Sequence, residues 1–175
     1  THVVRGEDHL SNSPKQLLVF EALGVEPPRY AHLPLLHGPD GKKLSKRYGA
    51  ASVQELRDAG YLPEALRNYI ALLGWGYDES TTFMTTDELV ERFALERVSK
   101  NPAVFDEQKL AWMNGHYIRE MDAGDLAGAA AEWLAGAGMP GPGDSRLPAA
   151  VAAVQEKIST LAEIPGLVGF AFQDE

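Results

Sequence analysis

The residues with the clearest chemistry are four cations that follow a tight turn. Pro39 and the Asp40-Gly41 pair favour a reversal of the chain, so residues 42–47 (KKLSKR) would lie on the tip of a loop that can move. Mobile lysines suit a polyphosphate, because they can close on it and neutralise the charge that grows on its oxygens during transfer. A solvated basic turn is the alternative interpretation, since short basic stretches are common.

A second candidate is Arg5, which ends a short apolar run and precedes Gly6, Glu7 and Asp8. In open α/β sheets ligands bind at the carboxyl ends of the strands, and the planar guanidinium of an arginine suits a carboxylate. An ion pair with Glu7 or Asp8 explains the same residue equally well. The local sequence does not choose between the two interpretations.

The histidines and tryptophans indicate packing rather than chemistry. Four histidines lack the spacing of metal ligands, and we expect them in packed or surface positions: His9, His32, His37 and His116. The three tryptophans lie within apolar clusters, and we predict core anchors rather than base-stacking platforms: Trp75, Trp112 and Trp133. Cysteine is absent, which excludes a disulfide framework, a thiolate zinc site and a cysteine nucleophile.

Two short strands and the helix between them are predicted to position Arg5 and the basic loop. Residues 2–5 indicate a buried strand, and residues 30–36 indicate a second one. Between them a helix is expected with Ser13 as its N-cap and Pro14 in its first turn, ending at Gly24. This order is a βαβ unit, which is too small to form a stable doubly wound sheet alone.

From residue 49 onward the pattern is helical, and no further strand is expected. Start signals for helices are two capping boxes, a proline and an aspartate: Ser52 with Glu55, Thr85 with Glu88, Pro63 and Asp106. Helices are predicted over residues 64–73, 107–114, 123–137 and 147–164, and residues 136–143 form a glycine-rich connection. The predicted fold class is mostly α with a small α/β part.

Length and composition are those of a globular protein: 175 residues, 45% hydrophobic and 23% charged. No apolar run approaches the roughly 18 residues of a membrane span and no leader pattern opens the chain, so we predict a cytoplasmic protein. The net charge of −9 argues against a nucleic-acid partner. However, residues 1–48 hold seven basic and five acidic side chains, so any contact with RNA must rest on local patches.

Several segments closely resemble the bacterial glutamyl-tRNA synthetases, a class I family. They are residues 4–14 (VRGEDHLSNSP), 31–36 (AHLPLL) and 38–47 (GPDGKKLSKR). The resemblance continues through residues 73–76 (LGWG), 99–106 (SKNPAVFD) and 109–119 (KLAWMNGHYIR). It covers most of residues 1–120 and afterwards rests mainly on helical character.

The resemblance implies a reaction of two steps. Glutamate and Mg-ATP give an enzyme-bound glutamyl adenylate, and the 3′-terminal adenosine of tRNA(Glu) then attacks it. The loop is similar to the second signature of class I enzymes, which binds the ATP phosphates, with Lys43 and Lys46 as catalytic residues. ATP contacts are implied for Lys43, Ser45, Lys46, Arg47, Leu35, Leu36, Asp8 and His9. Arg5 would contact a carboxylate of glutamate, and no zinc ligand is implied in this segment.

The resemblance also implies a domain order. Residues 1–48 would be the C-terminal remnant of a Rossmann-like catalytic fold, residues 49–121 a stem-contact helical domain and residues 122–175 part of a helical anticodon-binding domain. The first class I signature, His-x-Gly-His, is missing, and we therefore expect an inactive fragment whose second anticodon-binding domain lies beyond Glu175. We expect tRNA(Glu), glutamate and ATP as partners, no membrane, and a monomer.

Three alternatives remain at this point. A truncated paralogue that glutamylates a modified tRNA base lacks the helical part, so residues 100–175 argue against it. A synthetase of relaxed specificity would also charge tRNA(Gln). A non-catalytic module that binds RNA or phosphate would use the same basic loop without chemistry.

Overall fold

The computed structural model describes residues 1–44 and 52–172, and the chain divides into two compact units. The first unit consists of Thr1–Ala50 and Ile70–Phe105, and the second of Ala51–Tyr69 and Asp106–Glu175. Helices dominate the described residues, and their two small parallel sheets belong to the first unit. The prediction of a mostly α chain with a small α/β part is confirmed.

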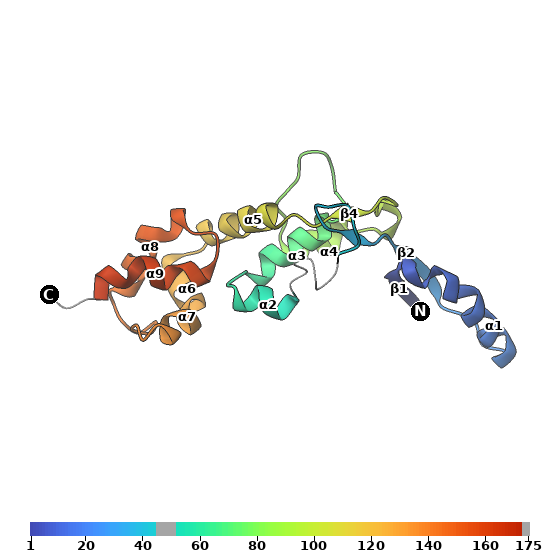
Figure 1. Cartoon of the computed structure of the whole chain (residues 1–175), viewed down its shortest axis with the longest axis horizontal. Coiled ribbons are helices and arrows are strands. Elements are labelled where there is room, and N and C mark those ends of the chain that lie inside the picture. The colour runs from blue at the N-terminus through green and yellow to red at the C-terminus, as the bar shows by residue number, and fades with distance from the viewer. Residues whose placement is uncertain (45–51, 173–175) are drawn as a thin grey trace. The chain divides into compact units, whose positions relative to one another are not determined.

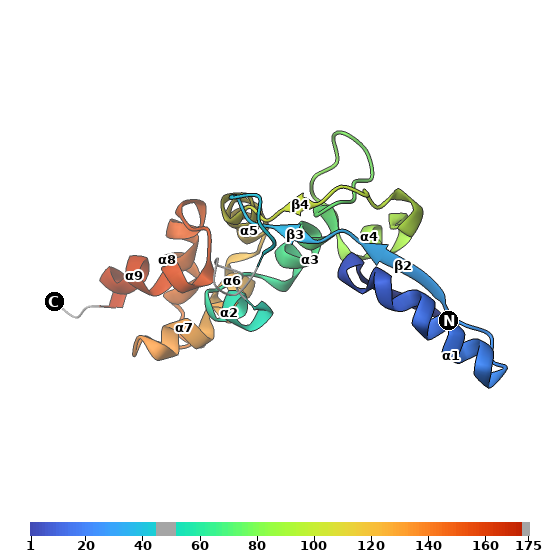
Figure 2. The ribbon, with the colours of Figure 1, turned by 45° about the vertical axis from the view of Figure 1, so that its right-hand side comes forward.

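The first unit begins with the predicted strand–helix–strand arrangement. Its elements are β1 (His2–Gly6), a 3-10 helix (Glu7–Asn12), α1 (Ser13–Leu23) and β2 (Arg29–Leu33). The two strands are parallel, and α1 lies along them in both views (Figures 1 and 2). The register sets Arg5 opposite His32, so their side chains leave neighbouring strands at the same level.

The two strands are less buried than predicted, and β2 is shorter. β1 pairs with β2 alone among the described strands, and Val4 is 46% exposed. β2 ends at Leu33 instead of continuing to residue 36, because Pro34 has no backbone N–H to donate to the ladder.

The helix between the strands starts one residue earlier than predicted. Asn12 occupies the N-cap, and Ser13 lies inside the first turn, where its hydroxyl contacts Arg5 and His32. The prediction of Ser13 as the cap is therefore wrong, because those two side chains engage the hydroxyl. The predicted end at Gly24 is confirmed by its left-handed φ of 64°.

A second pair of strands carries the basic turn. β3 (Leu36–His37) pairs parallel with β4 (Ala103–Val104) (Figure 2). The expectation of no strand beyond residue 49 is wrong, because two residues are too few to show alternation. The chain reverses at Gly41, whose φ of 72° suits glycine, and returns through a bridge between His37 and Lys43. The predicted tight turn is confirmed.

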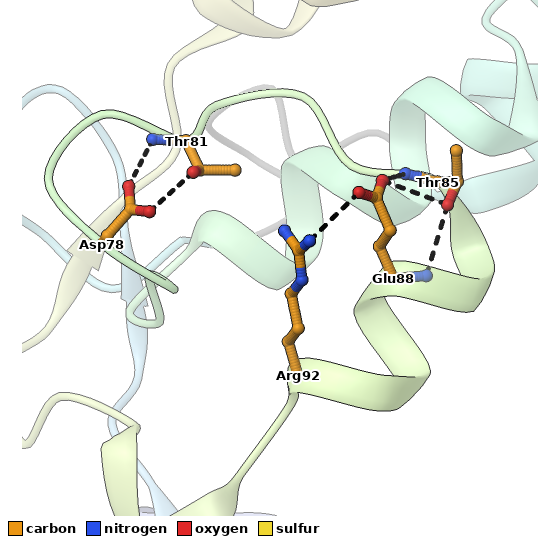
Figure 3. A network of polar contacts seen from close by, with 5 residues as sticks. All are labelled: Asp78, Thr81, Thr85, Glu88 and Arg92. Atoms are coloured by element: carbon orange, nitrogen blue, oxygen red, sulfur yellow. Dashed lines mark hydrogen bonds and ion pairs between the residues drawn. The ribbon is translucent and has the colours of Figure 1, made fainter.

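The remainder of the first unit packs against a small apolar cluster. α4 (Thr86–Arg92) begins with the predicted capping box of Thr85 and Glu88, and Arg92 pairs with Glu88 at 3.3 Å (Figure 3). The buried residues of the cluster are Trp75, Met84 and Leu89. Trp75 is 4% exposed, which confirms it as a core residue.

The loop before α4 is closed by the carboxylate of Asp78. Its oxygens accept hydrogen bonds from the hydroxyl of Thr81 at 2.7 Å and from the backbone N–H of Thr81 at 2.5 Å (Figure 3). The backbone N–H of Ser80 donates to the same carboxylate at 2.8 Å. These bonds stabilise the charged form and lower the pKa of Asp78 to about 2.

The second unit is helical throughout its described residues. Its helices are α2 (Val53–Asp58), α3 (Pro63–Leu72, whose end belongs to the first unit), α5 (Glu107–Arg119), α6 (Ala123–Ala129), α7 (Ala131–Gly136), α8 (Leu147–Val154) and α9 (Ile164–Val168). The predicted start signals are confirmed for α2, which has the Ser52 capping box, and for α5, where Asp106 accepts from the Lys109 N–H at 3.0 Å. No described helix combines the length and apolar character that crossing a membrane requires.

The predicted helix lengths are only partly correct. α5 continues to Arg119 instead of ending at residue 114, and residues 123–137 form two helices that meet at Ala130. Residues 147–164 are interrupted at Ile158, which is extended (ψ 148°), because Thr160 and Glu163 form a capping box that starts a new turn. The apolar spacing still marks the buried side, since these residues are all buried: Leu147, Val151, Val154, Ile158 and Leu161.

A buried polar junction joins α5 to the loops at each side of the core. The Asn114 side chain accepts from the Leu62 N–H at 2.8 Å and donates to Ser159 O at 2.6 Å and Gly60 O at 3.5 Å. The Leu161 N–H donates to Gly60 O at 3.0 Å. Since Asn114 is completely buried, these bonds satisfy groups that water cannot reach.

The other two tryptophans differ from each other. Trp133 is partly buried against the core, and its indole N–H donates to Asp58 O at 3.2 Å. Trp112 is 52% exposed, so its prediction as a core anchor is wrong. The reason is its place on α5, where Leu110 and Met113 form the buried side.

Candidate functional site

Arg5 is held at the end of β1 by three neighbours. Its Nη2 donates to Ser13 Oγ at 2.8 Å, and its Nε donates to His32 Nε2 at 3.3 Å. The guanidinium carbon lies 4.9 Å from the ring centre of Tyr30. Because these contacts come from β2 and the first turn of α1, the βαβ arrangement itself orients the arginine.

The structure shows no ion pair between Arg5 and the carboxylates that follow it in the sequence. Neither Glu7 nor Asp8 pairs with the guanidinium, and no ion pair joins Arg5 to any carboxylate of the described residues. Its partners are a hydroxyl, an imidazole and an aromatic ring, so no carboxylate compensates its positive charge locally. Such an arginine can receive a carboxylate from outside the protein.

Asp8 connects the end of β1 to the basic turn. Its Oδ2 lies 3.2 Å from Lys43 Nζ, and both side chains are substantially exposed. The hydrogen bond from Lys43, together with its charge, holds the pKa of Asp8 below the ordinary value of 3.8. A carboxylate and an ammonium that are 35 residues apart in sequence therefore lie together at the candidate site.

Backbone contacts position the two leucines between the strands and the turn. The Leu35 N–H lies 3.4 Å from Glu7 Oε1, and Leu36 O accepts from the Leu44 N–H at 2.7 Å. The turn beyond them is closed by Asp40, whose Oδ1 accepts from the Lys42 N–H at 3.0 Å. Lys43 follows this turn and forms a β-bridge with His37.

A cavity of about 400 Å³ adjoins the carboxyl end of β2. Its lining includes two carboxylates (Glu7 and Glu96), the imidazole of His32 and the ammonium of Lys100. Apolar residues such as Leu33 and Pro34 complete it. A mainly apolar hollow with a few charged groups is typical of a small-molecule site.

The structure brings together part of the predicted set. Arg5, Asp8, Lys43, Leu35 and Leu36 all lie around the carboxyl ends of β1 and β2. His9 lies on the 3-10 helix after β1, where its Nδ1 is 3.3 Å from Asn12 Nδ2. The predicted ligands Ser45, Lys46 and Arg47 lie outside the described residues.

Sequence reasoning missed Ser13, His32 and Tyr30 as partners of Arg5. A signal was present, because His32 and Tyr30 are polar or amphipathic residues within an apolar strand that pairs with β1. In the described part of the chain, no three His, Cys, Asp or Glu residues are grouped as a metal site would require.

Comparison with known proteins finds one family and several of its members. Residues 1–112 match the family described as tRNA synthetases class I (E and Q), catalytic domain. Glutamate–tRNA ligase from Moorella thermoacetica is 45% identical over 99% of this chain and 36% of its own length. Glutamate–tRNA ligase 1 from Caldanaerobacter subterraneus is 47% identical over 99% of this chain and 37% of its own.

Solved structures show the same likeness. A glutamate tRNA ligase from Elizabethkingia meningosepticum, crystallised in complex with its amino acid, matches 100% of this chain and 38% of its own with a TM-score of 0.85 and 30% identity. The chain thus spans a little over a third of the length of the relatives it matches.

Proposed function

Since the chain belongs to the catalytic-domain family of class I tRNA synthetases for glutamate and glutamine, we propose that it is part of a glutamate–tRNA ligase. That enzyme activates glutamate with ATP and transfers it to the 3′ end of tRNA(Glu). The observation that carries the proposal is the arrangement of an uncompensated Arg5 beside the Asp8–Lys43 pair. Relatives named as glutamate–tRNA ligases match nearly the whole chain, which supports it.

Each predicted residue has a role in this proposal. Arg5 binds a carboxylate of glutamate, and Lys43 and Lys46 bind the ATP phosphates with Ser45 and Arg47. The other proposed ATP contacts are the backbone of Leu35 and Leu36 and the side chains of Asp8 and His9. Lys43 exchanges Asp8 for a phosphate oxygen when ATP binds, which the exposure of the pair permits.

The mechanism relies on orientation and electrostatics. A glutamate carboxylate oxygen attacks the α-phosphorus of Mg-ATP, and pyrophosphate leaves as its negative charge is neutralised by the lysines. The ribose hydroxyl of the terminal adenosine of tRNA then attacks the carbonyl carbon of the adenylate, and AMP leaves. No covalent intermediate with the protein is required.

The tRNA partner is supported by one face of α5, on which Lys109 and Trp112 are exposed and His116 and Arg119 are partly exposed. Lys109, Trp112, His116 and Arg119 are spaced by three or four residues and share one face of the helix. The indole of Trp112 is 52% exposed, and an indole beside cations suits an RNA backbone and its bases. We assign residues 49–121 to stem contact and residues 122–175 to anticodon binding, in a cytoplasmic monomer.

The proposal is tested by ATP–pyrophosphate exchange and aminoacylation with tRNA(Glu) present. We expect no exchange by this chain alone, and detectable exchange by it would contradict the assignment to a part of the enzyme. In the full-length enzyme, Lys46→Ala should slow adenylate formation more than it weakens glutamate binding. Lys15→Ala, an exposed lysine of α1, is the matched control. Unchanged turnover of Lys46→Ala would contradict the loop assignment.

A second candidate function is relaxed specificity, since the matched family covers enzymes for glutamine as well as glutamate. A ligase of relaxed specificity would also glutamylate tRNA(Gln). Aminoacylation of both tRNAs by the same preparation decides between the two. Binding of tRNA without glutamate transfer by the full-length protein would instead favour a non-catalytic RNA-binding module, whose affinity should fall steeply with salt.

A further inference from the structure

Ser13 and His32 form a closed triangle of polar contacts with Arg5. Arg5 Nη2 lies 2.8 Å from Ser13 Oγ, Arg5 Nε lies 3.3 Å from His32 Nε2, and Ser13 Oγ lies 3.0 Å from His32 Nε2. Ser13 is 8% exposed, so its hydroxyl has little access to water. The three residues come from α1, β1 and β2, which makes the triangle a product of the fold.

The direction of these hydrogen bonds determines the protonation of His32. A guanidinium can only donate, so Nε2 of His32 has to carry a lone pair. Ser13 Oγ accepts from Arg5 Nη2, which leaves its own hydrogen to be donated to the same Nε2. The imidazole is therefore neutral with its proton on Nδ1, the less common tautomer of a free histidine side chain.

The stacking of Tyr30 holds the imidazole in this orientation. The two rings are nearly parallel, with an interplanar angle of 10° and centroids 6.2 Å apart. The guanidinium of Arg5 lies over the same tyrosine. The guanidinium of Arg5 and the imidazole of His32 thus both pack against Tyr30 of β2.

These contacts occupy one edge of the guanidinium. Nε and one N–H of Nη2 are engaged, and the other three N–H groups, two on Nη1 and one on Nη2, have no partner among the described residues. The remaining groups form a two-pronged donor at the far end of the side chain, which matches the geometry of a carboxylate.

We propose that Ser13 and neutral, Nδ1-protonated His32 are positioning residues, which fill the Nε edge of Arg5 and so present its Nη1 and Nη2 end to a carboxylate of the amino-acid substrate. This inference rests on the proposed function for its substrate. The two residues act through Arg5 and make no contact with the reacting atoms. Their removal should therefore weaken glutamate binding without changing the use of ATP.

The first test measures the tautomer in this chain, without any activity. Long-range ¹⁵N–¹H correlation spectra distinguish a protonated ring nitrogen from one with a lone pair. We expect an unprotonated Nε2 and a protonated Nδ1 for His32, with the exposed His2 of β1 as an internal reference. A proton on Nε2 of His32 overturns the inference, whatever the enzyme does.

The second test measures kinetics of the full-length enzyme. Ser13→Ala should raise KM for glutamate about tenfold or more while kcat and KM for ATP change little, because one hydrogen bond to a charged group is lost. Ser13→Thr, which keeps the hydroxyl, should restore most of the affinity. His32→Phe keeps an aromatic ring beside Tyr30 but no acceptor, whereas His32→Gln keeps an acceptor, so the second variant should be the less impaired.

The controls separate this inference from the proposed function. His2→Gln changes an exposed histidine of the same sheet and should leave KM for glutamate unaltered. Folded and active variants whose KM for glutamate equals that of the wild type overturn the inference alone. A wild-type full-length enzyme that forms no glutamyl-tRNA contradicts the proposed function, and the spectra of His32 remain a separate result.

Discussion

The second unit is built around a continuous apolar core, whereas the candidate site of the first unit is built from half-exposed polar contacts. The core draws completely buried residues from α3, α5 and the helices that follow, among them Ala65, Ile118 and Leu134. The Lys43–Asp8 pair of the first unit leaves 57% and 43% of its side chains exposed. The proposed chemistry thus lies where burial contributes least to stability. Exposed side chains can exchange a protein partner for a substrate more readily than buried ones.

The apolar side chains show the same contrast. Several on β1 and α1 are substantially exposed, including Val4, Leu18, Val19 and Leu23. By comparison, the predicted apolar positions of α8 are buried. Substitutions in the core of the second unit should therefore change stability, and those at the candidate site of the first unit should mainly change binding.

The largest loss of stability is expected at Gly60 of the second unit. Its φ is 87°, and a Cβ there would lie 2.5 Å from the Ala162 nitrogen and 2.7 Å from the Leu161 nitrogen. Gly60→Ala should lower the free energy of unfolding by about 3 kcal/mol or more, because backbone atoms cannot move aside cheaply. Urea unfolding followed by tryptophan fluorescence measures it.

Gly138 provides the matched control for Gly60. Its φ is 70°, but no atom lies within 4 Å of a Cβ placed there. Gly138→Ala should cost about 1 kcal/mol, the cost of the left-handed conformation alone. Equal losses at the two glycines would show that the close approach at Gly60 has no energetic weight.

The next largest effect is expected at Asn114. Asn114→Ala removes the partner of the buried Leu62 N–H and of the part-buried Ser159 carbonyl, and should cost about 2–3 kcal/mol in urea unfolding. Asn101→Ala, at an exposed position of the first unit, should change stability by about 0.5 kcal/mol or less. A loss at Asn114 no greater than at Asn101 would contradict the role of the buried junction.

A smaller effect on stability, which depends on pH, is expected for a substitution of Asp78 in the first unit. Its folded pKa of about 2 lies below the ordinary value of 3.8, so its charged form contributes stability above pH 3.8. That contribution is lost as the pH falls through about 2. The difference in Tm between wild type and Asp78→Asn should therefore be greatest above pH 4 and shrink toward pH 2.

The second unit offers a counterpart to Asp78. Hydrogen bonds from the Arg146 side chain and N–H lower the pKa of Asp144 to about 2 as well. Asp144→Asn should show a pH dependence of the same sign. A Tm difference that grows on acidification would contradict both assignments.

The smallest effect is expected at the ion pair of Arg57 and Glu132. Their charged atoms are 3.9 Å apart, and the side chains are 67% and 73% exposed. Arg57→Ala should change the free energy of unfolding by less than about 0.5 kcal/mol. A double-mutant cycle with Glu132→Ala measures the coupling energy between the two side chains. A coupling above about 1 kcal/mol would show that this surface ion pair also stabilises the second unit.

Local signals in the sequence predicted most element starts. The capping boxes at Ser52 and Thr85, the cap at Asp106 and the stop at Gly24 need only residues within one turn, and the structure confirms all four. Non-local features were missed. β4 exists because β3 pairs with it, and the interruption at Ile158 depends on the capping box that follows.

The candidate site was predictable in its residue types but not in its contacts. The resemblance implied Arg5, Asp8 and Lys43, yet the Lys43–Asp8 contact depends on how the turn folds back. Ser13 was assigned to the helix cap by its position before Pro14, because its competing partner, Arg5, lies on another element. The predicted roles of Ser45, Lys46 and Arg47 stay predictions.

Gly6 stands between the proposed carboxylate-binding arginine and the aspartate that pairs with Lys43. A Cβ at this position would lie 2.5 Å from Asp8 Oδ1 and 3.6 Å from Leu35 Cδ2. A methyl group would thus push the Asp8 carboxylate away from Lys43 rather than strain the strand. A substitution at position 6 would therefore act on the candidate site through position 8, by displacing the carboxylate that pairs with Lys43.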